Sequence, residues 1–407
     1  MTFCEIARNT IKDRLENRDF LPNVLQKIEI AARQGKIAFY PCGRYSRIIL
    51  QEIKKENPAL LKKIIGCFDK SRDASMEKGI QVFHISQLDD FKEDMALLVV
   101  ASNTFYSKEL ADLQEFTSYR GEILKTSRFD ITLEVEADYA LDRIDKILRL
   151  LADEKSRMTY LLIWLSRLLN DETPTFLFET ETPQVSPEGS TVHYKNYTIE
   201  GIDDWDCRKE LDAEIYEMRY VRPQPGDVVL DIGAYKGDTA VFFADRVGAK
   251  GKVYSFEPVK ANFRDLQRTI ENNQLQDIVS PFNLGLSDRS GVMKATSSKS
   301  GAAWSFLSEA QGMEDVELIS VDEFVRKNKL QRVDFIKMDV EGMEEKVIVG
   351  MSDTIRRFHP QLAIPLYHLA SDLLNIPLLI EEMGGYDMYI RCKVEGPYGI
   401  NLYCKAK

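Results

Sequence analysis

The stretch PGDVVLDIGAYKGDTAVFFADRVGAKGKVYSFEPVK, residues 225–260, decides the fold of the second half of the chain. An apolar run ends in Asp231, a glycine-bearing turn follows at 233–237, and a helical pattern begins at Asp238. A second apolar run again ends in an acid, Glu257. A strand, a glycine turn, a helix and a strand with an acid at its tip predict the βαβ unit that holds an adenosine-containing cofactor.

The turn indicates which cofactor is held. Its pattern, D-x-G-x-x-x-G, differs from the G-x-G-x-x-G that brings backbone amides close to a dinucleotide pyrophosphate. The methyl donor S-adenosylmethionine carries no phosphate, and its ammonium group needs acceptors, which a carboxylate and the turn carbonyls supply. The predicted donor contacts in the turn are Asp231, Gly233, Ala234, Tyr235 and Gly237. The alternative is a βα turn that binds no nucleotide.

The ends of the next two predicted strands complete the donor site. A carboxylate at Glu257 can accept both ribose hydroxyls, and Pro258 then stops the strand and opens a helix. A third strand, 278–284, leads Asn283 and Leu284 to the carboxyl edge of the sheet, where ligands of open α/β sheets bind. We therefore expect Glu257 at the ribose, Asn283, Leu284 and Gly285 near the adenine, and Pro258 and Asp339 as further cofactor contacts.

A fourth predicted strand, 333–339, ends in a second acidic pair. Asp339 and Glu341 lie two positions apart at this tip, beside the expected cofactor cleft. Carboxylates there can orient an acceptor, remove its proton or bind Mg²⁺, and whether a metal takes part stays open. The alternative is that they cap the helix predicted over 343–348.

A fifth predicted strand, 358–368, closes with His368. Histidine is the side chain best suited to act as a base near neutral pH, and this one should face the same edge as Asp339. We therefore count Asp339, Glu341 and His368 as candidate catalytic residues, with a purely structural histidine as the alternative. His359 precedes the strand and should lie at the opposite edge.

Composition excludes several classes of protein. The 407 residues carry a formal net charge of −11, which does not favour nucleic acid or an anionic membrane as the partner. The six cysteines are scattered without a CxxC pair, as expected for free thiols in a reducing compartment. The first 20 residues carry charges throughout, and no apolar run reaches the ~18 residues of a membrane span. These features predict a cytoplasmic protein without a signal peptide.

The first half of the chain predicts a separate small domain. Helical spacing runs over residues 1–34 with a break at Pro22, and strands alternate with helices over 36–130, as in a Rossmann-like parallel sheet. A single glycine, Gly43, follows the first strand, so a phosphate or nucleotide sugar is one candidate ligand. A purely structural or dimerising domain is the other interpretation.

A connector joins the two halves. Residues 137–170 are helical and too apolar for a free linker, so they pack between domains or against a second copy in a homodimer. Prolines and glycine over 171–200 mark a boundary, within which 191–199 alternates like a strand pair, and 209–220 reads as helix. We expect three parts: an N-terminal α/β domain at 1–135, a helical connector at 136–200 and the cofactor domain at 201–407.

Residues 226–404 resemble the FkbM family of S-adenosylmethionine-dependent methyltransferases. The matching motifs are DIGAYKGDT at 231–239, FEP at 256–258, SVDEF at 320–324, KMDVEG at 337–342, HPQLAIPLYH at 359–368 and DLLNIP at 372–377. The resemblance implies a Rossmann-like α/β methyltransferase domain, O-methylation of a sugar, glycan or polyketide-like hydroxyl, and Asp231, Gly233 and Glu257 as cofactor contacts. Tyr235 and Lys236 depart from the family pattern, which puts the environment of the donor carboxylate in doubt.

Two rival functions stay open. An NAD-dependent sugar oxidoreductase has similar winding but needs G-x-G-x-x-G and usually a Tyr-x-x-x-Lys pair, neither of which is in place. A non-catalytic nucleotide-binding or scaffold protein would instead use the N-terminal domain as its working part. Binding of the methyl donor separates both from a methyltransferase.

Overall fold

The computed structural model describes residues 3–17, 24–42, 44–70, 75–77, 80–102, 107–127, 137–169, 185–188, 191–202, 211–295, 314–369, 371–393 and 399–407. Two compact units divide the chain, Met1–Asp142 with Leu161–Pro174 and Arg143–Tyr160 with Thr175–Lys407. The expected three-part division stays a prediction. Pro22, Gly43 and most of the 171–200 boundary lie outside the described residues.

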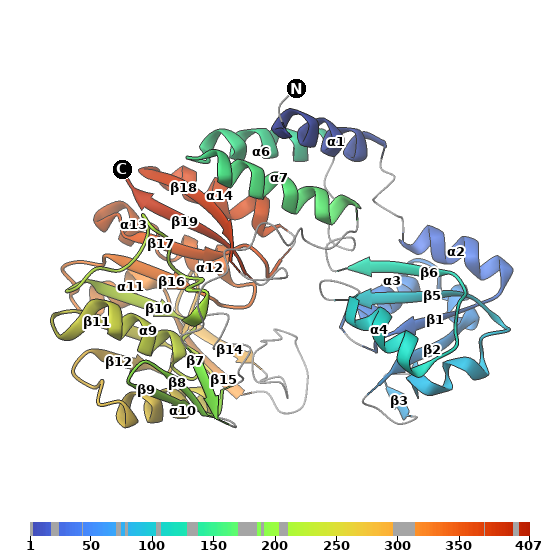
Figure 1. The fold of residues 1–407 in the computed structure, drawn as a ribbon, viewed down its shortest axis with the longest axis horizontal. Coiled ribbons are helices and arrows are strands. Elements are labelled where there is room, and N and C mark those ends of the chain that lie inside the picture. The colour runs from blue at the N-terminus through green and yellow to red at the C-terminus, as the bar shows by residue number, and fades with distance from the viewer. Residues whose placement is uncertain are drawn as a thin grey trace. The chain divides into compact units, whose positions relative to one another are not determined.

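The first unit is built on a six-stranded sheet of order β3-β4-β2-β1-β5-β6 (Figure 1). All neighbouring pairs are parallel except β3 with β4. Along β1, Ile37 and Phe39 belong to one buried cluster, whereas Ala38 and Tyr40 belong to another. Both faces of the sheet are therefore covered, as parallel strands require, and the predicted α/β character of this region is confirmed. The elements are α1 (Phe3–Asn17), α2 (Val24–Gln34), β1 (Lys36–Tyr40), α3 (Arg44–Glu56), β2 (Ile64–Asp69), β3 (Ser75–Glu77), β4 (Ile80–His84), β5 (Met95–Ser102), α4 (Ser107–Phe116) and β6 (Ile123–Ser127).

The second unit contains a seven-stranded sheet of order β12-β11-β10-β16-β17-β19-β18 (Figure 1). Strands β12, β11, β10, β16 and β17 run parallel, and β19 runs antiparallel to both β17 and β18. The carboxyl ends of the five parallel strands and of β18 therefore share one edge of the sheet. The strands are β10 (Val228–Ile232), β11 (Lys252–Phe256), β12 (Val279–Phe282), β16 (Phe335–Met338), β17 (Gln361–Pro365), β18 (Tyr386–Cys392) and β19 (Ile400–Ala406).

Helices cover both faces of this sheet. Val229, Val253 and Phe335 face a buried cluster shared with α9 and α10, whereas Phe256 turns its ring to Phe324 of α11 on the other face, at a centroid distance of 4.7 Å. A smaller sheet of order β13-β15-β14 adjoins the end of β12. These elements are α9 (Asp238–Val247), α10 (Lys260–Asn272), β13 (Gly285–Leu286), β14 (Gly291–Ala295), β15 (Glu314–Ile319), α11 (Val321–Lys327), α12 (Glu344–Val349), α13 (Ser352–Phe358) and α14 (Asp372–Met383).

Several predicted boundaries differ from the structure. The helical stretch over 137–170 is two helices, α6 (Ala137–Leu150) and α7 (Glu154–Leu169), and the predicted strand pair is a sheet of β7 (Val185–Glu188), β8 (Thr191–Tyr194) and β9 (Tyr197–Glu200). The helix predicted over 209–220 is wrong for its described part, because residues 213–220 run as turns and bends. The fifth strand is also shorter than predicted. It starts after a left-handed His359 ends α13, and it stops at Pro365.

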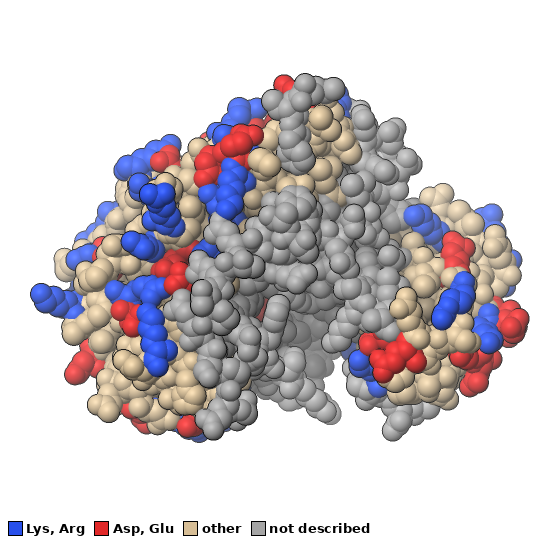
Figure 2. All heavy atoms as spheres, viewed as in Figure 1, with Lys and Arg blue, Asp and Glu red and all other residues tan. Residues whose placement is uncertain are grey.

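The described surface has mixed charge. On the face shown in Figure 2, lysine and arginine side chains alternate with aspartate and glutamate, without an extended basic surface among the described residues. Among the described helices, none combines the length and the apolar character that crossing a membrane requires.

Candidate functional site

The candidate site lies at the shared carboxyl edge, where β10 and β16 are neighbours. Ile232 of β10 accepts a hydrogen bond from the backbone amide of Asp339, which directly follows β16, at 2.9 Å. On the other side, the amides of Gly233 and Ala234 donate to the carbonyl of Phe256 at 3.0 and 2.9 Å. The glycine turn is therefore fixed between the tips of its two neighbouring strands.

A buried polar row crosses three strands beneath the turn. Ser255, Asp231 and Lys337 stand opposite one another on β11, β10 and β16. The fully buried carboxylate of Asp231 accepts hydrogen bonds from Ser255 Oγ at 3.1 Å and from Thr239 Oγ1 at 3.0 Å, and it lies 3.3 Å from Lys337 Nζ. The Asp231 carboxylate thus finds hydrogen-bond donors within the protein, as a buried carboxylate requires.

Lys337 connects this row to the turn. Its ammonium donates to the carbonyl oxygen of Gly233 at 2.5 Å and lies 4.9 Å from the centroid of the Tyr216 ring. The expectation that Asp231 contacts the donor ammonium, directly or through water, stays a prediction, and Lys337 contacts both this carboxylate and one turn carbonyl. Asp231 holds Lys337, and Lys337 holds the turn.

Two glycines of the turn are required by their conformation. Gly233 has a φ of +82°, and a Cβ atom there would lie 1.9 Å from the carbonyl oxygen of Asp339. Gly237 has a φ of +100° at the start of α9, and a Cβ atom there would lie 3.1 Å from the side chains of Leu266 and Thr269 on α10. The first glycine permits the close approach of two strand tips, and the second permits tight packing of two helices.

Glu257 lies at the tip of β11, as predicted, and is almost fully buried. Its carboxyl group accepts hydrogen bonds from the backbone amides of Tyr235 at 3.1 Å and Val259 at 2.9 Å. Burial outweighs these donors and raises the pKa of Glu257 to about 8. Asn283 donates to the carbonyls of Glu257 and Pro258 at 2.8 and 2.9 Å, so it braces this corner.

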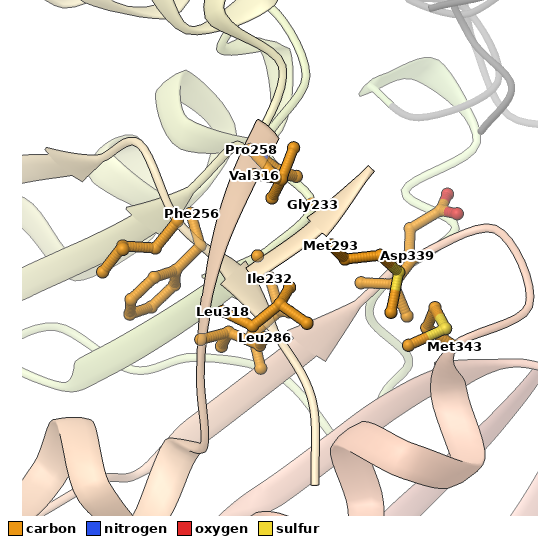
Figure 3. A pocket seen from close by; sticks show the side chains of 13 residues that line it. Ile232, Gly233, Phe256, Pro258, Leu286, Met293, Val316, Leu318, Asp339 and Met343 are labelled. Atoms are coloured by element: carbon orange, nitrogen blue, oxygen red, sulfur yellow. The ribbon is translucent and has the colours of Figure 1, made fainter. Parts of the chain in front are cut away.

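An apolar cavity opens beside the turn (Figure 3). Ile232 and Phe256 reach it from the large sheet, and Leu286, Val316 and Leu318 reach it from the small sheet. Asp339 adds a carboxylate to the otherwise apolar lining. The cavity measures about 40 Å³, and two flexible side chains, Met293 and Met343, belong to its lining. The full lining is Ile232, Gly233, Phe256, Pro258, Leu284, Gly285, Leu286, Met293, Val316, Leu318, Asp339, Val340 and Met343.

Asp339 is the centre of a polar cluster next to this cavity. Its Oδ2 accepts hydrogen bonds from the phenol groups of Tyr216 at 2.5 Å and Tyr367 at 3.1 Å. Its Oδ1 lies 3.2 Å from Nε2 of His368. Donors on both oxygens stabilise the ionised form and hold the carboxylate in one orientation.

His368 lies three residues beyond β17, buried among acids. Its Nδ1 lies 2.8 Å from Glu344, and Nε2 lies 3.7 Å from Glu341 in addition to Asp339. Burial opposes the charged imidazolium, but the carboxylates of Glu344, Glu341 and Asp339 outweigh it and raise the pKa of His368 well above its usual range. The role of His368 as a base stays a prediction, and it requires the neutral imidazole that these carboxylates disfavour.

The turn after Asp339 presents Glu341. Glu341 has a φ of +54°, uncommon for a residue other than glycine, and Gly342 follows with a φ of +97°. The carboxylate of Glu344 at the start of α12 accepts hydrogen bonds from the backbone amides of Val340 and Gly342, at 3.0 and 2.9 Å. These bonds stabilise the turn. Backbone strain of this kind concentrates at functional sites.

Three of these side chains could also hold a metal ion. Asp339, Glu341 and His368 each offer one ligand atom, and these atoms lie within 4.8 Å of one another. Oxygen ligands suit Mg²⁺, whereas an imidazole nitrogen suits transition metals better. The donor set therefore fits a divalent cation only with a neutral His368, and the imidazole makes magnesium the less favoured choice.

The predicted site residues fall into groups. Gly233, Pro258, Leu284 and Asp339 line the cavity, and Glu341 and His368 join Asp339 in the polar cluster. The predicted residues that do not line the cavity are Asp231, Ala234, Tyr235, Gly237, Glu257 and Asn283.

Sequence reasoning missed Tyr216, Lys337, Glu344 and Tyr367. Tyr367 directly precedes His368 at the end of a predicted strand, and Glu344 opens a predicted helix, so both had a positional signal. Tyr216 lies in an irregular segment and had none.

The family comparison agrees with this geometry. Residues 231–386 match the family described as the methyltransferase FkbM domain. The resemblance to the FkbM family is thereby confirmed for this part of the chain.

Two characterised relatives and one solved structure are similar to the chain. The hexuronic acid methyltransferase AglP of Haloferax volcanii is 26% identical over 190 residues, which are 46% of this chain and 75% of that protein. The 2-O-methyltransferase NoeI of Sinorhizobium fredii is 31% identical over 152 residues, 33% of this chain and 61% of that protein. The crystal structure of a methyltransferase FkbM from Methylobacillus flagellatus KT aligns over 99% of both chains with a TM-score of 0.60 at 17% identity. This last likeness confirms the predicted α/β fold.

Proposed function

Because residues 231–386 belong to the methyltransferase FkbM family, we propose that this protein transfers a methyl group from S-adenosylmethionine to a hydroxyl group of a sugar or glycan. The observation that carries the proposal is the contact between the glycine turn at Gly233 and Asp339, where an apolar cavity meets a carboxylate cluster. The names of the two similar proteins, a hexuronic acid methyltransferase and a 2-O-methyltransferase, support a sugar hydroxyl as the acceptor.

The residues of the site suit the proposed donor. The apolar lining between the two sheets matches the flat face of an adenine, and Leu284 and Pro258 belong to it. Glu257 stands at the tip of β11, where a carboxylate accepts ribose hydroxyls. The remaining carbonyls of the turn are acceptors for the ammonium group, while Asp231 acts indirectly by fixing Lys337 against Gly233. When bound, S-adenosylmethionine supplies a methyl group on a sulfonium, already a reactive electrophile.

The carboxylate cluster then orients the acceptor and takes its proton. Asp339, held by two phenols and the His368 imidazolium, accepts a hydrogen bond from the acceptor hydroxyl and aligns its oxygen. Glu341, whose side chain is 31% exposed, is the proposed base, because its carboxylate can reach solvent and lies beside Asp339 in the same cluster. The surrounding carboxylates favour the imidazolium form of His368, and its charge in turn stabilises Asp339 and Glu341.

Calorimetry on the full chain tests the donor. We expect heat on adding S-adenosylmethionine and none on adding NAD, and a nucleotide sugar tests the first unit in the same way. Absence of heat with S-adenosylmethionine refutes the proposed function. Transfer of a labelled methyl group to sugars carrying free hydroxyls tests the reaction.

Substitution of Asp339 tests the mechanism. Asp339→Ala should lower turnover by orders of magnitude and leave donor binding measurable, because its carboxylate faces the acceptor side. Unchanged turnover removes Asp339 from the mechanism. Activity before and after EDTA treatment tests the metal: a loss that Mg²⁺ or Mn²⁺ restores assigns the cluster to a cation, and unchanged activity assigns it to the carboxylates alone.

A further inference from the structure

A second cavity in the second unit, distinct from the methyl-transfer site, has the size and charge of a ligand pocket. It measures about 510 Å³, within the ~300–1,000 Å³ typical of small-molecule sites. It lies beside the edge strand β18 and the irregular segment 213–222, and its residues belong to one compact unit. The lining is Asp153, Lys155, Glu214, Glu217, Met218, Arg219, Tyr220, Arg222, Arg391 and Lys393.

Each acid of this lining is paired with an arginine. Asp153 pairs with Arg391 at 2.5 Å, and this arginine with Ser156 lowers the pKa of Asp153 to about 2 despite its burial. Glu214 and Glu217 share the guanidinium of Arg246, at 2.5 and 3.0 Å. Two guanidinium groups therefore offset most of the charge of these three carboxylates.

The cations of the lining exceed the acids. Within the described part of the chain, no carboxylate lies within the 4.0 Å of an ion pair from Arg219, Arg222 or Lys393. Arg219 and Arg222 are exposed. The ammonium of Lys393 is buried and donates to the carbonyls of Ala213 and Glu214 at 3.3 and 3.2 Å. The pocket therefore presents an unbalanced positive charge, which suits a carboxylate or a phosphate.

An aromatic surface borders these cations. Tyr220 is 47% exposed, pairs with Tyr389 at a centroid distance of 6.2 Å, and carries the Arg219 guanidinium at 5.4 Å from its ring. A tyrosine ring packs against the apolar C–H face of a sugar, and its hydroxyl bonds to the polar edge. An aromatic ring beside guanidinium groups is complementary to a sugar that carries an anionic group.

We propose that this pocket binds an anionic sugar, either a uronate through its carboxylate or a sugar phosphate through its phosphate. The choice of a sugar rests on the proposed function, whereas the anionic group is argued from the lining alone. Arg222 exchanges hydrogen bonds with Gln361 at the start of β17, and the Tyr220 ring lies 5.9 Å from the ammonium of Lys405 near the end of β19, so both residues lie toward the sheet edge opposite Asp339. The pocket is thus a second ligand site, separate from the place of methyl transfer.

Titration calorimetry on the full chain, with and without S-adenosylhomocysteine, tests the pocket. The probes are glucuronate, glucose 1-phosphate and glucose. We expect one or both anionic probes to bind at least tenfold more tightly than glucose, with affinity that falls as salt is added. The stronger of the two identifies carboxylate or phosphate as the anion.

Substitutions locate the binding. Arg219→Gln or Arg222→Gln should lower the affinity for the anionic probe roughly tenfold, because each removes one charge-assisted contact. The matched control Arg264→Gln removes an exposed arginine of α10 and should change nothing. Equal binding of glucose, no binding of either anion, or unchanged affinity in both lining variants overturns the proposal. If the chain binds the anionic probe but not S-adenosylhomocysteine, the proposed function is refuted and the proposed pocket is not.

Discussion

Substitution of Gly233 by alanine tests the contact on which the site is built. The residue has a φ of +82°, and its new Cβ would lie 1.9 Å from the carbonyl oxygen of Asp339. Left-handed backbone costs a residue with a side chain about 1–2 kcal/mol. Relieving the contact toward an ordinary separation of roughly 3.5 Å displaces a strand tip by more than about 1 Å, and such overpacking costs about 1–3 kcal/mol more.

Gly226→Ala is the matched control. Gly226 has a similar φ of +90°, but nothing lies within 4 Å of the Cβ it would receive. The free energy of unfolding of Gly226→Ala should therefore fall only by the cost of the left-handed backbone, about 1–2 kcal/mol. The difference between the two variants isolates the close approach of the turn to Asp339.

Two measurements check this pair. Urea unfolding gives the free energy of unfolding, in which Gly233→Ala should fall below Gly226→Ala by about 1–3 kcal/mol. Methyl transfer at a temperature where both stay folded should drop roughly 10²-fold for Gly233→Ala only, since an error near 1 Å in a reacting group costs about that much. Equal stabilities and equal rates would refute the argument that the donor turn and Asp339 are in contact.

Further predictions concern single hydrogen bonds and charges. Tyr216→Phe keeps the ring but removes a donor from Asp339 and should lower kcat about tenfold with little change in donor affinity, as measured by steady-state kinetics and calorimetry. Glu257 has a pKa raised to about 8, so the ligand-free protein should lose stability as pH rises from about 4.5 to about 8, and Glu257→Gln should abolish that part of the unfolding profile. Asp153 has a pKa lowered to about 2 beside Arg391, so its stabilising effect should be lost as pH falls from about 4 to about 2. Asp153→Asn should remove this acid-side loss of stability, which amounts to at most about 1–2 kcal/mol because the Asp153 side chain is one-third exposed.

The sequence predicts the sheet well because its central strands are continuous apolar runs ended by acids. Positions such as Glu257 and Asp339 follow from this, since parallel strands bring their carboxyl ends to one edge. The partner of Asp231 does not follow, because it depends on which residues of β11 and β16 stand opposite, and one sequence does not define that register.

The raised pKa of His368 could not be predicted for a related reason. It depends on three carboxylates brought together by the fold, among them Glu344 at the start of α12, which lies 2.8 Å from the imidazole. Tyr216 is the hardest residue to predict, since it reaches Asp339 from a segment without periodic structure. The sequence around Tyr216 has a helical pattern because buried side chains such as Leu211 and Ile215 pack in the same cluster as residues of the sheet, although the segment is mostly irregular.

The donor turn and the acceptor cluster are mechanically one unit. Lys337 is bound to Asp231 on one side and to the carbonyl of Gly233 on the other, and the same strand continues directly into Asp339. Any movement of the turn is thereby passed to Asp339, the carboxylate proposed to orient the acceptor. Methyl transfer depends on alignment of the attacking oxygen with the sulfonium, so a rigid connection between the two binding elements supplies what the reaction needs. This explains why a buried ion pair, weak as a source of stability, is retained beneath the site.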